Sequence, residues 1–555
     1  MVRATFSGFN TALSALQANQ KRLDITGQNL SNMNTAGYTR QQLEASSLNY
    51  TNPVSHYSNG NETAVGFGVS MDRVSQIRDP YLDIQYRSQS ADCSYTNRLQ
   101  TALNSLSKVL DETTISGIRQ AFDDIQSTLT SMQDPAKVSD PIYESELRTK
   151  MQSVCNLFNQ ASRQITQAEQ NEFQRLTGEG SSEQGDVQKI NDILRQIGDL
   201  NVQIKRNQVA GHPSLELQDE RNLLLDELSG YIPVETRYYK DDAHSGNNAY
   251  DYDANGAVIG KKDWPDDLEV SMNYIDAQGK SQKLILVNGS DLGADGLTKN
   301  YGQLSVLNRD HKPAASVSDP ANISIKFEKA PSYKGNGQAA TDVYAELKGI
   351  HFEGGSLQAS LDMLQKKGTG NVINGSVDDV RGYQYYSEKL DQLADTFAKS
   401  MNASNNGNNH KDQNLLSNST DDSTNGITAG NIGISKGWTS GTIHISTDGT
   451  NRTDTILDMI AAMKDTKKLN GKTFADYMNN LSTQLASDSS SNQTALKTGT
   501  TVLNSIQDSR DSLSGVSLDE EATNMMAYVS AYNAASRLMT ALDEVLNTLI
   551  SNTGA

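Results

Sequence analysis

The sequence predicts a mainly α protein with a β insertion domain. It would comprise long paired terminal helices that are coiled-coil-like, a helical core domain and an antiparallel β outer domain. Three observations support this fold class. Apolar residues recur at heptad spacing near both chain ends, only 10 prolines occur in 555 residues, and β-branched and aromatic residues alternate with polar ones in the middle. Because proline breaks helices, a proline-poor chain allows long, uninterrupted ones.

The N-terminal segment has an apolar residue every seven positions, at Phe9, Leu16, Leu23 and Leu30, with Leu13 at an intermediate position. A 3.5-residue period is typical of a coiled-coil or helix-bundle seam, which at ~1.5 Å per residue is about 33 Å long here. We therefore predict one long helix with a single apolar stripe.

The C-terminal segment has a fuller stripe whose spacing alternates between four and three residues. Its members are Met525, Tyr528, Tyr532, Ala535, Met539, Leu542, Leu546 and Leu549. Ser517 and Glu520 form an S-x-x-E pattern that predicts a capping box at the start of this helix. Residues 1–50 carry a net charge of +2 and residues 518–555 a net charge of −4, which favours pairing of the two terminal helices.

The remaining chain forms a helical domain of two segments and, inserted between them, a β domain. Residues 70–235 and 354–500 read mostly as amphipathic helix, whereas residues 236–353 contain short alternating runs separated by Gly, Asn and Asp. The simplest topology places the chain ends side by side, in an assembly domain of residues 1–69 and 501–555, with the β domain at the far tip. We also predict a polar surface loop over Asn402–Gly426 and a short strand pair near Trp438–Ser446.

Composition excludes several classes of protein. The net charge is −19 and no run of Lys or Arg exceeds two residues, which argues against nucleic-acid binding. No stretch approaches the ~18 apolar residues of a membrane span, and no Sec-type signal peptide is recognisable at the N-terminus. Cys93 and Cys155 are the only cysteines, and we predict two buried thiols in preference to one disulfide.

The sequence offers no catalytic constellation and no cofactor motif. The seven histidines are scattered, and neither a nucleophile elbow nor a phosphate loop occurs. One metal candidate exists, because Asp251, Asp253 and Asn255 fit the first positions of a calcium-binding EF-hand loop. The twelfth position is Lys262 in place of a bidentate carboxylate, so a hairpin turning at Asn255-Gly256 is the favoured reading.

The terminal stripes have two possible interpretations. They could belong to two long helices packed in the core of one molecule, or they could form a contact between molecules. Both arrangements give the same periodicity. A stripe at the extreme ends of a chain has few neighbours within one molecule, which favours a polymerising subunit.

The segment Gly27–Arg40 reads G-Q-N-L-S-N-M-N-T-A-G-Y-T-R. Within it, Asn32, Asn34 and Gly37 are turn formers that end the first helix, and Tyr38 is available as an anchor. The segment resembles the N-terminal signature of bacterial flagellar rod, hook and hook-associated proteins. The patterns at Ser514–Ala522, Leu217–Ser229 and Leu390–Asn402 narrow the resemblance to the hook-associated proteins that adjoin the hook.

The resemblance implies a non-enzymatic structural subunit that polymerises at the hook–filament junction and connects hook to filament. The terminal helices would form the inner tube and the β insertion the outer surface. The implied partners are further copies in a ring or tube, the hook protein, a second junction protein next to the filament, and an export chaperone on the C-terminal helix. The location would be the extracellular flagellum, reached without a cleaved signal.

The predicted assembly interface combines both stripes with the signature residues. It consists of Phe9, Leu13, Leu16, Leu23, Leu30, Asn32, Asn34, Gly37, Tyr38, Met525, Tyr528, Tyr532, Ala535, Met539, Leu542, Leu546 and Leu549. One alternative is a hook or distal-rod subunit. An alternative of another class is a calcium-dependent surface adhesin or hydrolase acting through the β insertion.

Overall fold

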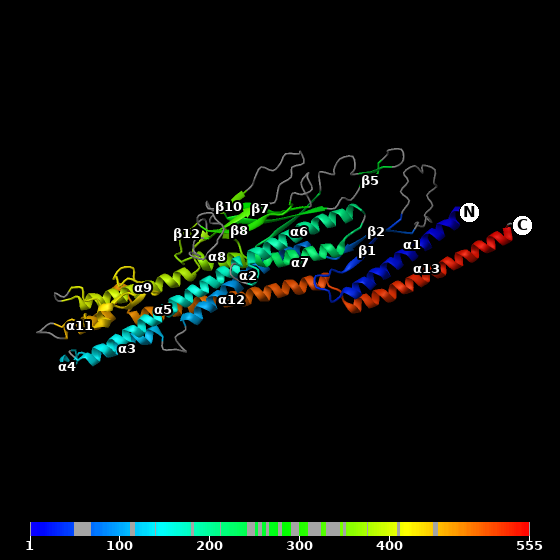
Figure 1. Ribbon diagram of the computed structural model, residues 1–555. Coiled ribbons are helices and arrows are strands. Elements are labelled where there is room, and N and C mark those ends of the chain that lie inside the picture. Colours follow the sequence, from blue (N-terminus) through cyan, green and yellow to red (C-terminus); the bar gives the residue numbers. More distant parts are fainter. Residues whose placement is uncertain are drawn as a thin grey trace.

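The computed structural model is an elongated molecule with both chain ends at one tip (Figure 1). It describes residues 2–48, 68–110, 117–138, 140–178, 182–210, 212–240, 250–252, 258–261, 266–275, 280–289, 299–308, 323–328, 344–347, 351–373, 376–407, 411–447 and 453–553.

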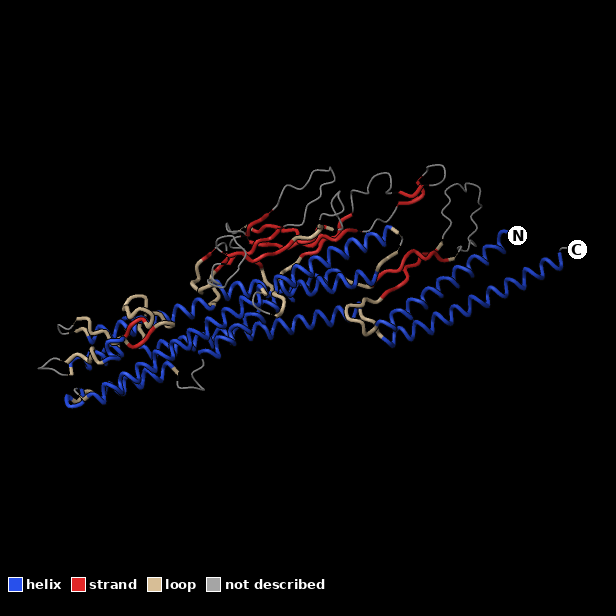
Figure 2. The backbone as a smooth tube through the Cα atoms, viewed as in Figure 1, coloured by secondary structure: helices blue, strands red, loops and turns tan. Residues whose placement is uncertain are grey.

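Helices, most of them long, make up most of the described chain (Figure 2). They are α1 (Val2–Asn32), α2 (Pro80–Leu110), α3 (Ile118–Ser131), α4 (Pro135–Val138), α5 (Pro141–Thr177), α6 (Asp186–Val209), α7 (Leu215–Tyr231), α8 (Ser356–Gln365), α9 (Tyr383–Asn405), α10 (Lys436–Ser440), α11 (Asp454–Lys464), α12 (Phe474–Ser514) and α13 (Leu518–Thr553). A 3₁₀ turn, Lys467–Leu469, precedes α12.

The strands are short, and every described pair is antiparallel. They are β1 (Gln41–Ser47), β2 (Val69–Gln76), β3 (Glu235–Lys240), β4 (Tyr250–Tyr252), β5 (Val258–Lys261), β6 (Asp266–Ile275), β7 (Ser281–Asn288), β8 (Gln303–Asn308), β9 (Ile323–Glu328), β10 (Tyr344–Leu347), β11 (His351–Phe352), β12 (Val372–Ile373), β13 (Ser376–Val377), β14 (Leu416–Asn418) and β15 (Ile432–Ile434).

The predicted fold class is confirmed, with helices at both ends and an antiparallel β insertion between α7 and α8. Within the insertion, β6 pairs with β3, β7 and β11, and β9 pairs with β8 and β10. The prediction that the β strands form the far tip is wrong. They lie alongside α6, α7 and α8, midway along the molecule, because α6 covers them through Asn191 and Asn201, which bind strand and loop backbone (Figure 1). The tip opposite the termini is made by α3, α4, α9 and α11.

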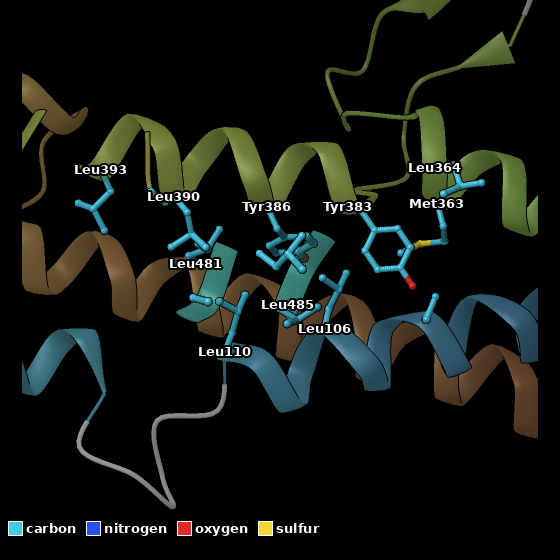
Figure 3. Close-up of a cluster of buried hydrophobic side chains, with 14 of the residues drawn as sticks. Leu106, Leu110, Met363, Leu364, Tyr383, Tyr386, Leu390, Leu393, Leu481 and Leu485 are labelled. Atoms are coloured by element: carbon cyan, nitrogen blue, oxygen red, sulfur yellow. The ribbon is translucent and has the colours of Figure 1, made fainter. Parts of the chain in front are cut away.

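The large hydrophobic core runs through the helical bundle. Aromatic rings from four helices meet at its centre, where Phe122 contacts Phe158, Phe397 and Phe474 at centroid distances of 5.2–6.0 Å. Figure 3 shows a neighbouring part of the core, where Leu106 and Leu110 of α2 meet Tyr386 and Leu390 of α9 and Leu485 of α12. Cys93 and Cys155 are buried free thiols, as predicted, and burial raises the pKa of Cys155 to about 12.

Two local predictions between residues 402 and 446 need correction. Trp438 does not lie in a strand but in α10, because the Ser435 side chain accepts a hydrogen bond from the Trp438 amide and so caps that short helix. The strand pair of this region is β14 with β15. The polar segment before Gly426 is only partly a surface loop, since Leu415 and Leu416 are buried and their amides donate to the Asn402 side chain.

Candidate assembly surface

The two terminal helices form an antiparallel pair that extends away from the core (Figure 1). Gly8 lies against Leu542, and the guanidinium of Arg22 lies 5.7 Å from the centre of the Tyr528 ring. At the opposite end of the pair, Arg40 binds Glu520 at 2.6 Å and Glu521 at 2.9 Å. The pairing of the terminal helices that the opposite net charges favour is therefore present within one molecule.

The predicted C-terminal stripe faces α1 along most of its length. Ala535 is buried, and Met525, Tyr528, Tyr532, Met539, Leu542 and Leu546 are half-buried. Leu549, near the tip of the pair, is exposed. The α13 side of the predicted interface is thus half covered within one molecule.

The predicted N-terminal stripe is half-buried at Phe9, Leu16, Leu23 and Leu30, while Leu13 is 46% exposed. The most deeply covered apolar residues of α1 are Ala12, Ala18 and Ile25, which the heptad reading omitted. The cause is that α1 packs on α13 and also on the β1–β2 hairpin, so its contact face is wider than one seam.

The hairpin of β1 and β2 was not predicted from sequence. Gln41 pairs with Gln76 and Ser47 with Val69, in antiparallel register with one irregularity after Glu44. Its sequence signal is weak because β1 reads Q-Q-L-E-A-S-S, with only Leu43 and Ala45 apolar.

The signature residues organise the turn that leaves α1. The Asn29 side chain donates to the Gln41 carbonyl at 3.0 Å and accepts from both the Gln41 amide and the Tyr38 hydroxyl. Asn32 closes the end of the helix by accepting from the Thr35 amide and hydroxyl. The sequence reading singled out Tyr38 but missed its partner Asn29, although Asn29 belongs to the same signature.

Of the remaining signature residues, Asn34 is exposed and Gly37 adopts a left-handed conformation with φ of 77°. A side chain at Gly37 would be strained there. Its backbone lies beside Leu223 of α7, which brings the turn against the helical core.

The turn leads into a polar joint between the terminal pair and the core. The Thr39 amide and hydroxyl donate to Asp219 at 3.0 and 2.6 Å, and the Arg40 amide donates to the Ser514 carbonyl. Arg78 binds Asp83 at 2.5 Å. These bonds join segments that are far apart in sequence, so spacing could not predict them.

Arg510, near the end of α12, completes this joint. It binds Asp83 at 3.0 Å and Asp226 at 2.7 Å, and its guanidinium stacks 4.3 Å from the centre of the Tyr86 ring. Arg87 also binds Asp226, at 2.8 Å. A cavity of about 720 Å³ lies among these side chains.

The electrostatics of the joint follow from partial burial. Burial raises the pKa of Asp219, and the hydrogen bonds from Thr39 together with the charge of Arg78 only partly offset that effect. Burial and the nearby carboxylates, including Glu216 and Asp219, raise the pKa of Tyr38. The Tyr38 hydroxyl therefore remains protonated and acts as the donor to Asn29.

The calcium candidate is only partly within the described chain. β4 and β5 pair antiparallel, as expected for the hairpin reading, but Asp253 and Asn255 lie outside the described residues. Among the residues that the structure describes, no cluster of three or more His, Cys, Asp or Glu side chains is arranged to hold a metal ion. None of the described helices is long and apolar enough to cross a membrane.

Comparisons with known proteins match three parts of the chain to flagellar families. Residues 103–415 match the helical domain of flagellar hook-associated protein FlgK. Residues 9–39 match the flagella basal body rod protein family, and residues 509–552 match the C-terminal family of the basal body rod proteins FlgEFG. The two shorter matches cover much of the terminal helix pair.

Individual relatives are also hook-associated proteins. Flagellar hook-associated protein 1 of Bacillus subtilis is 29% identical over 99% of both chains. The protein of that name from Salmonella typhimurium is 29% identical over 41% of this chain and 38% of its own. The solved flagellar hook junction protein FlgK of Burkholderia pseudomallei aligns with a TM-score of 0.38 and 19% identity, covering 61% of this chain and 45% of that one. On the match over residues 103–415, which is more than half of its length, the chain belongs to the flagellar hook-associated protein FlgK family.

Proposed function

We propose that this chain is a structural subunit of the bacterial flagellum that polymerises at the hook–filament junction and connects hook to filament. The observation that carries the proposal is the terminal pair of α1 and α13, which leaves the core and retains exposed and half-buried apolar side chains along its length. Because soluble proteins rarely expose contiguous apolar surface except at interaction sites, the pair is suited to packing between subunits.

We assign the assembly role to residues 1–69 and 501–555, which would line the inner tube. Residues 70–235 and 354–500 form the surrounding helical domain, and residues 236–353 the outer surface. The boundary at 500 and 501 falls inside α12, which is continuous from Phe474 to Ser514. This helix therefore connects the joint rigidly to the core.

The named interface residues divide into two roles under this proposal. Side chains of the two stripes, from Phe9 to Leu30 and from Met525 to Leu549, supply the apolar surface between helices. Asn32, Asn34, Gly37 and Tyr38 position the pair, since Tyr38 binds Asn29 of α1 and Asn32 binds Thr35 of the turn.

The proposed partners are further copies of the chain, the hook protein on one side and a second junction protein on the filament side. An export chaperone would cover α13 before assembly, when its apolar face is open to solvent. The proposed location is the extracellular flagellum, reached through the flagellar export channel.

Two alternatives receive less support. A hook or distal-rod subunit would share the terminal matches, but the match over residues 103–415 is to a hook-associated helical domain. A calcium-dependent adhesin or hydrolase lacks a supporting observation: Asp251 is the one candidate ligand whose backbone is described, and the family is a structural one.

Immunogold electron microscopy of flagella from the source bacterium tests this proposal. An antibody against the chain should label the boundary between hook and filament. Label along the hook or the rod would favour the alternative axial subunit, and label over the cell surface would contradict a flagellar role.

A further inference from the structure

The side of α13 that does not contact α1 carries a second heptad row. It consists of Ala527, Ala531, Ala534, Leu538, Ala541 and Val545, spaced four and three residues apart in alternation. Each member directly precedes a residue of the row that packs on α1, so the second row is rotated by about 100° around the helix. Leu538 and Val545 are 48% and 55% exposed. A helix with two heptad rows can pack between two others, and α1 covers only one.

A groove of about 710 Å³ lies between α1 and the β1–β2 hairpin. Its apolar lining comes from Leu13 and Leu16 of α1 and from Leu43, Met71 and Val74 of the hairpin. Leu13 and Met71 are both largely open to solvent, at 46% and 42% exposed. The groove is thus an apolar recess beside the terminal pair.

The residues of α1 that line this groove recur every three or four positions along the helix. Leu13, Gln17, Gln20 and Asp24 line the groove at spacings of four, three and four residues. Such a row accepts a second helix running along α1, because both then repeat at 3.5 residues. This wall of the groove is therefore one face of α1 along which a second helix can pack, with Leu13 as its apolar part and Gln17, Gln20 and Asp24 as its polar part.

The second row and the groove lie on different sides of the terminal pair. Tyr532 of α13 borders the groove, and at 100° per residue it lies about 120–140° around the helix from Leu538 and Val545. A molecule cannot place its own second row in its own groove. A second molecule can, and such a contact between unlike surfaces repeats from copy to copy into a ring or a helical array.

Charge favours the same occupant. Lys21 and Asp24 line the groove with opposite charges, and Arg73 at its rim binds Glu44 of β1 at 2.7 Å. The second row is flanked by the exposed carboxylates of Asp543 and Glu544, directly before Val545, and by the exposed Arg537, directly before Leu538. Residues 518–555 as a whole carry a net charge of −4. The excess carboxylates of α13 can approach Lys21 and the exposed Arg73, which favours one orientation of the entering helix.

We propose that the groove between α1 and the β1–β2 hairpin receives the second heptad row of α13 from another copy of this chain. This inference rests on the proposed assembly function and specifies its contact. Leu538 and Val545 of one copy pack against Leu13 and Met71 of the next.

Disulfide trapping tests the contact in the full chain. The double variant Met71→Cys with Leu538→Cys, produced in the source bacterium in place of the natural chain, should give a ladder of multimers on a non-reducing gel after oxidation of isolated flagella. The native Cys93 and Cys155 are buried, so they do not compete. The matched control is Met71→Cys with Thr540→Cys. Thr540 is exposed on the opposite side of α13 and should give no ladder.

Several results would overturn the inference. These are a ladder of equal yield in the control, a band that stops at two chains, disulfides to another protein only, or no ladder while the chain still labels the hook–filament boundary. The last result leaves the proposed function standing, whereas loss of boundary label from the natural chain would remove both.

A charge substitution provides a second test. Leu538→Asp should abolish the connection of filaments to hooks, because a carboxylate would enter an apolar groove. Since Leu538 is half exposed in one molecule, the thermal unfolding of the purified variant should match that of Thr540→Asp, which should keep its filaments. A Leu538→Asp chain that still supports filaments overturns the contact.

Discussion

The helical core and the terminal pair bury their apolar residues to different extents. In the core, Phe122, Phe397 and Phe474 are fully buried against one another. In the terminal pair, most stripe residues are half-buried, and Leu13, Leu538 and Val545 are exposed. The core is therefore buried within a single molecule, whereas the terminal pair leaves apolar surface open to solvent, as the proposed subunit interface requires.

The joint between the core and the terminal pair is held by a different kind of contact from those within either region. Its contacts are charge-assisted hydrogen bonds around Arg40, Arg78 and Arg510 rather than apolar packing. Directional bonds of this kind fix an angle between two bodies. The comparison thus supports the proposal that the core provides stability, the joint orientation and the terminal pair the assembly surface.

The largest expected effect on folding comes from the core. Phe122→Ala removes the ring that three other phenylalanines contact and should lower the free energy of unfolding by about 3–5 kcal/mol. Urea denaturation of the full chain measures this. A loss no larger than that of Leu538→Ala on the exposed face would show that the core is not the source of stability.

The joint should respond less strongly. Arg510→Met keeps the apolar length of the side chain but removes the ion pairs with Asp83 and Asp226, at an expected cost of about 1.5–3 kcal/mol. Hydrogen exchange should also become faster around residues 515–521, where α12 passes into α13. The exposed Arg537→Met is the control and should change stability by less than about 0.5 kcal/mol. If hydrogen exchange around residues 515–521 were unchanged in Arg510→Met, Arg510 would not be needed to hold the joint.

The terminal pair should show a small stability change with a large change in assembly. Leu542→Ala, which removes the half-buried contact with Gly8, should cost about 1 kcal/mol in the free molecule. In the bacterium it should reduce the fraction of hooks that carry filaments, because the same side chain supports the packed helices. A drop in stability as large as that of Phe122→Ala would erase the contrast between the two regions.

The smallest expected effect is the pH dependence of the joint. Burial raises the pKa of Asp219 above its ordinary value of about 3.9, so the folded state binds this proton more tightly than the unfolded state. The ionised group therefore lowers stability near neutral pH, and the penalty disappears as the pH falls through the folded pKa. Relative to Asp219→Asn, the natural chain should gain unfolding free energy between about pH 7 and pH 4. Urea midpoints that move in the opposite direction would reverse the sign assigned to Asp219.

The sequence predicted those parts of the fold that periodicity encodes. The stripes beginning at Phe9 and Met525 identified α1 and α13, and the alternating runs located the β insertion. The position of the insertion along the molecule could not be predicted from periodicity, because it depends on contacts between distant segments. Leu268 joins the same buried apolar cluster as Ile197 of α6, and its carbonyl accepts a hydrogen bond from Asn201.

The joint could not be predicted from the sequence for a related reason. Its members lie at positions as distant as Thr39, Asp219 and Arg510, and no local spacing links them. The signature turn was recognised through Asn32 and Tyr38, but its central hydrogen-bonding residue, Asn29, sits inside the helix and reads locally as an ordinary polar position.

Deletion of residues 525–555 tests most directly the claim that the terminal pair serves assembly while the core serves folding. The truncated chain should unfold cooperatively in urea with its core intact, and bacteria that carry only this form should display hooks without filaments in electron micrographs. Filaments still joined to hooks by the truncated chain would contradict the account.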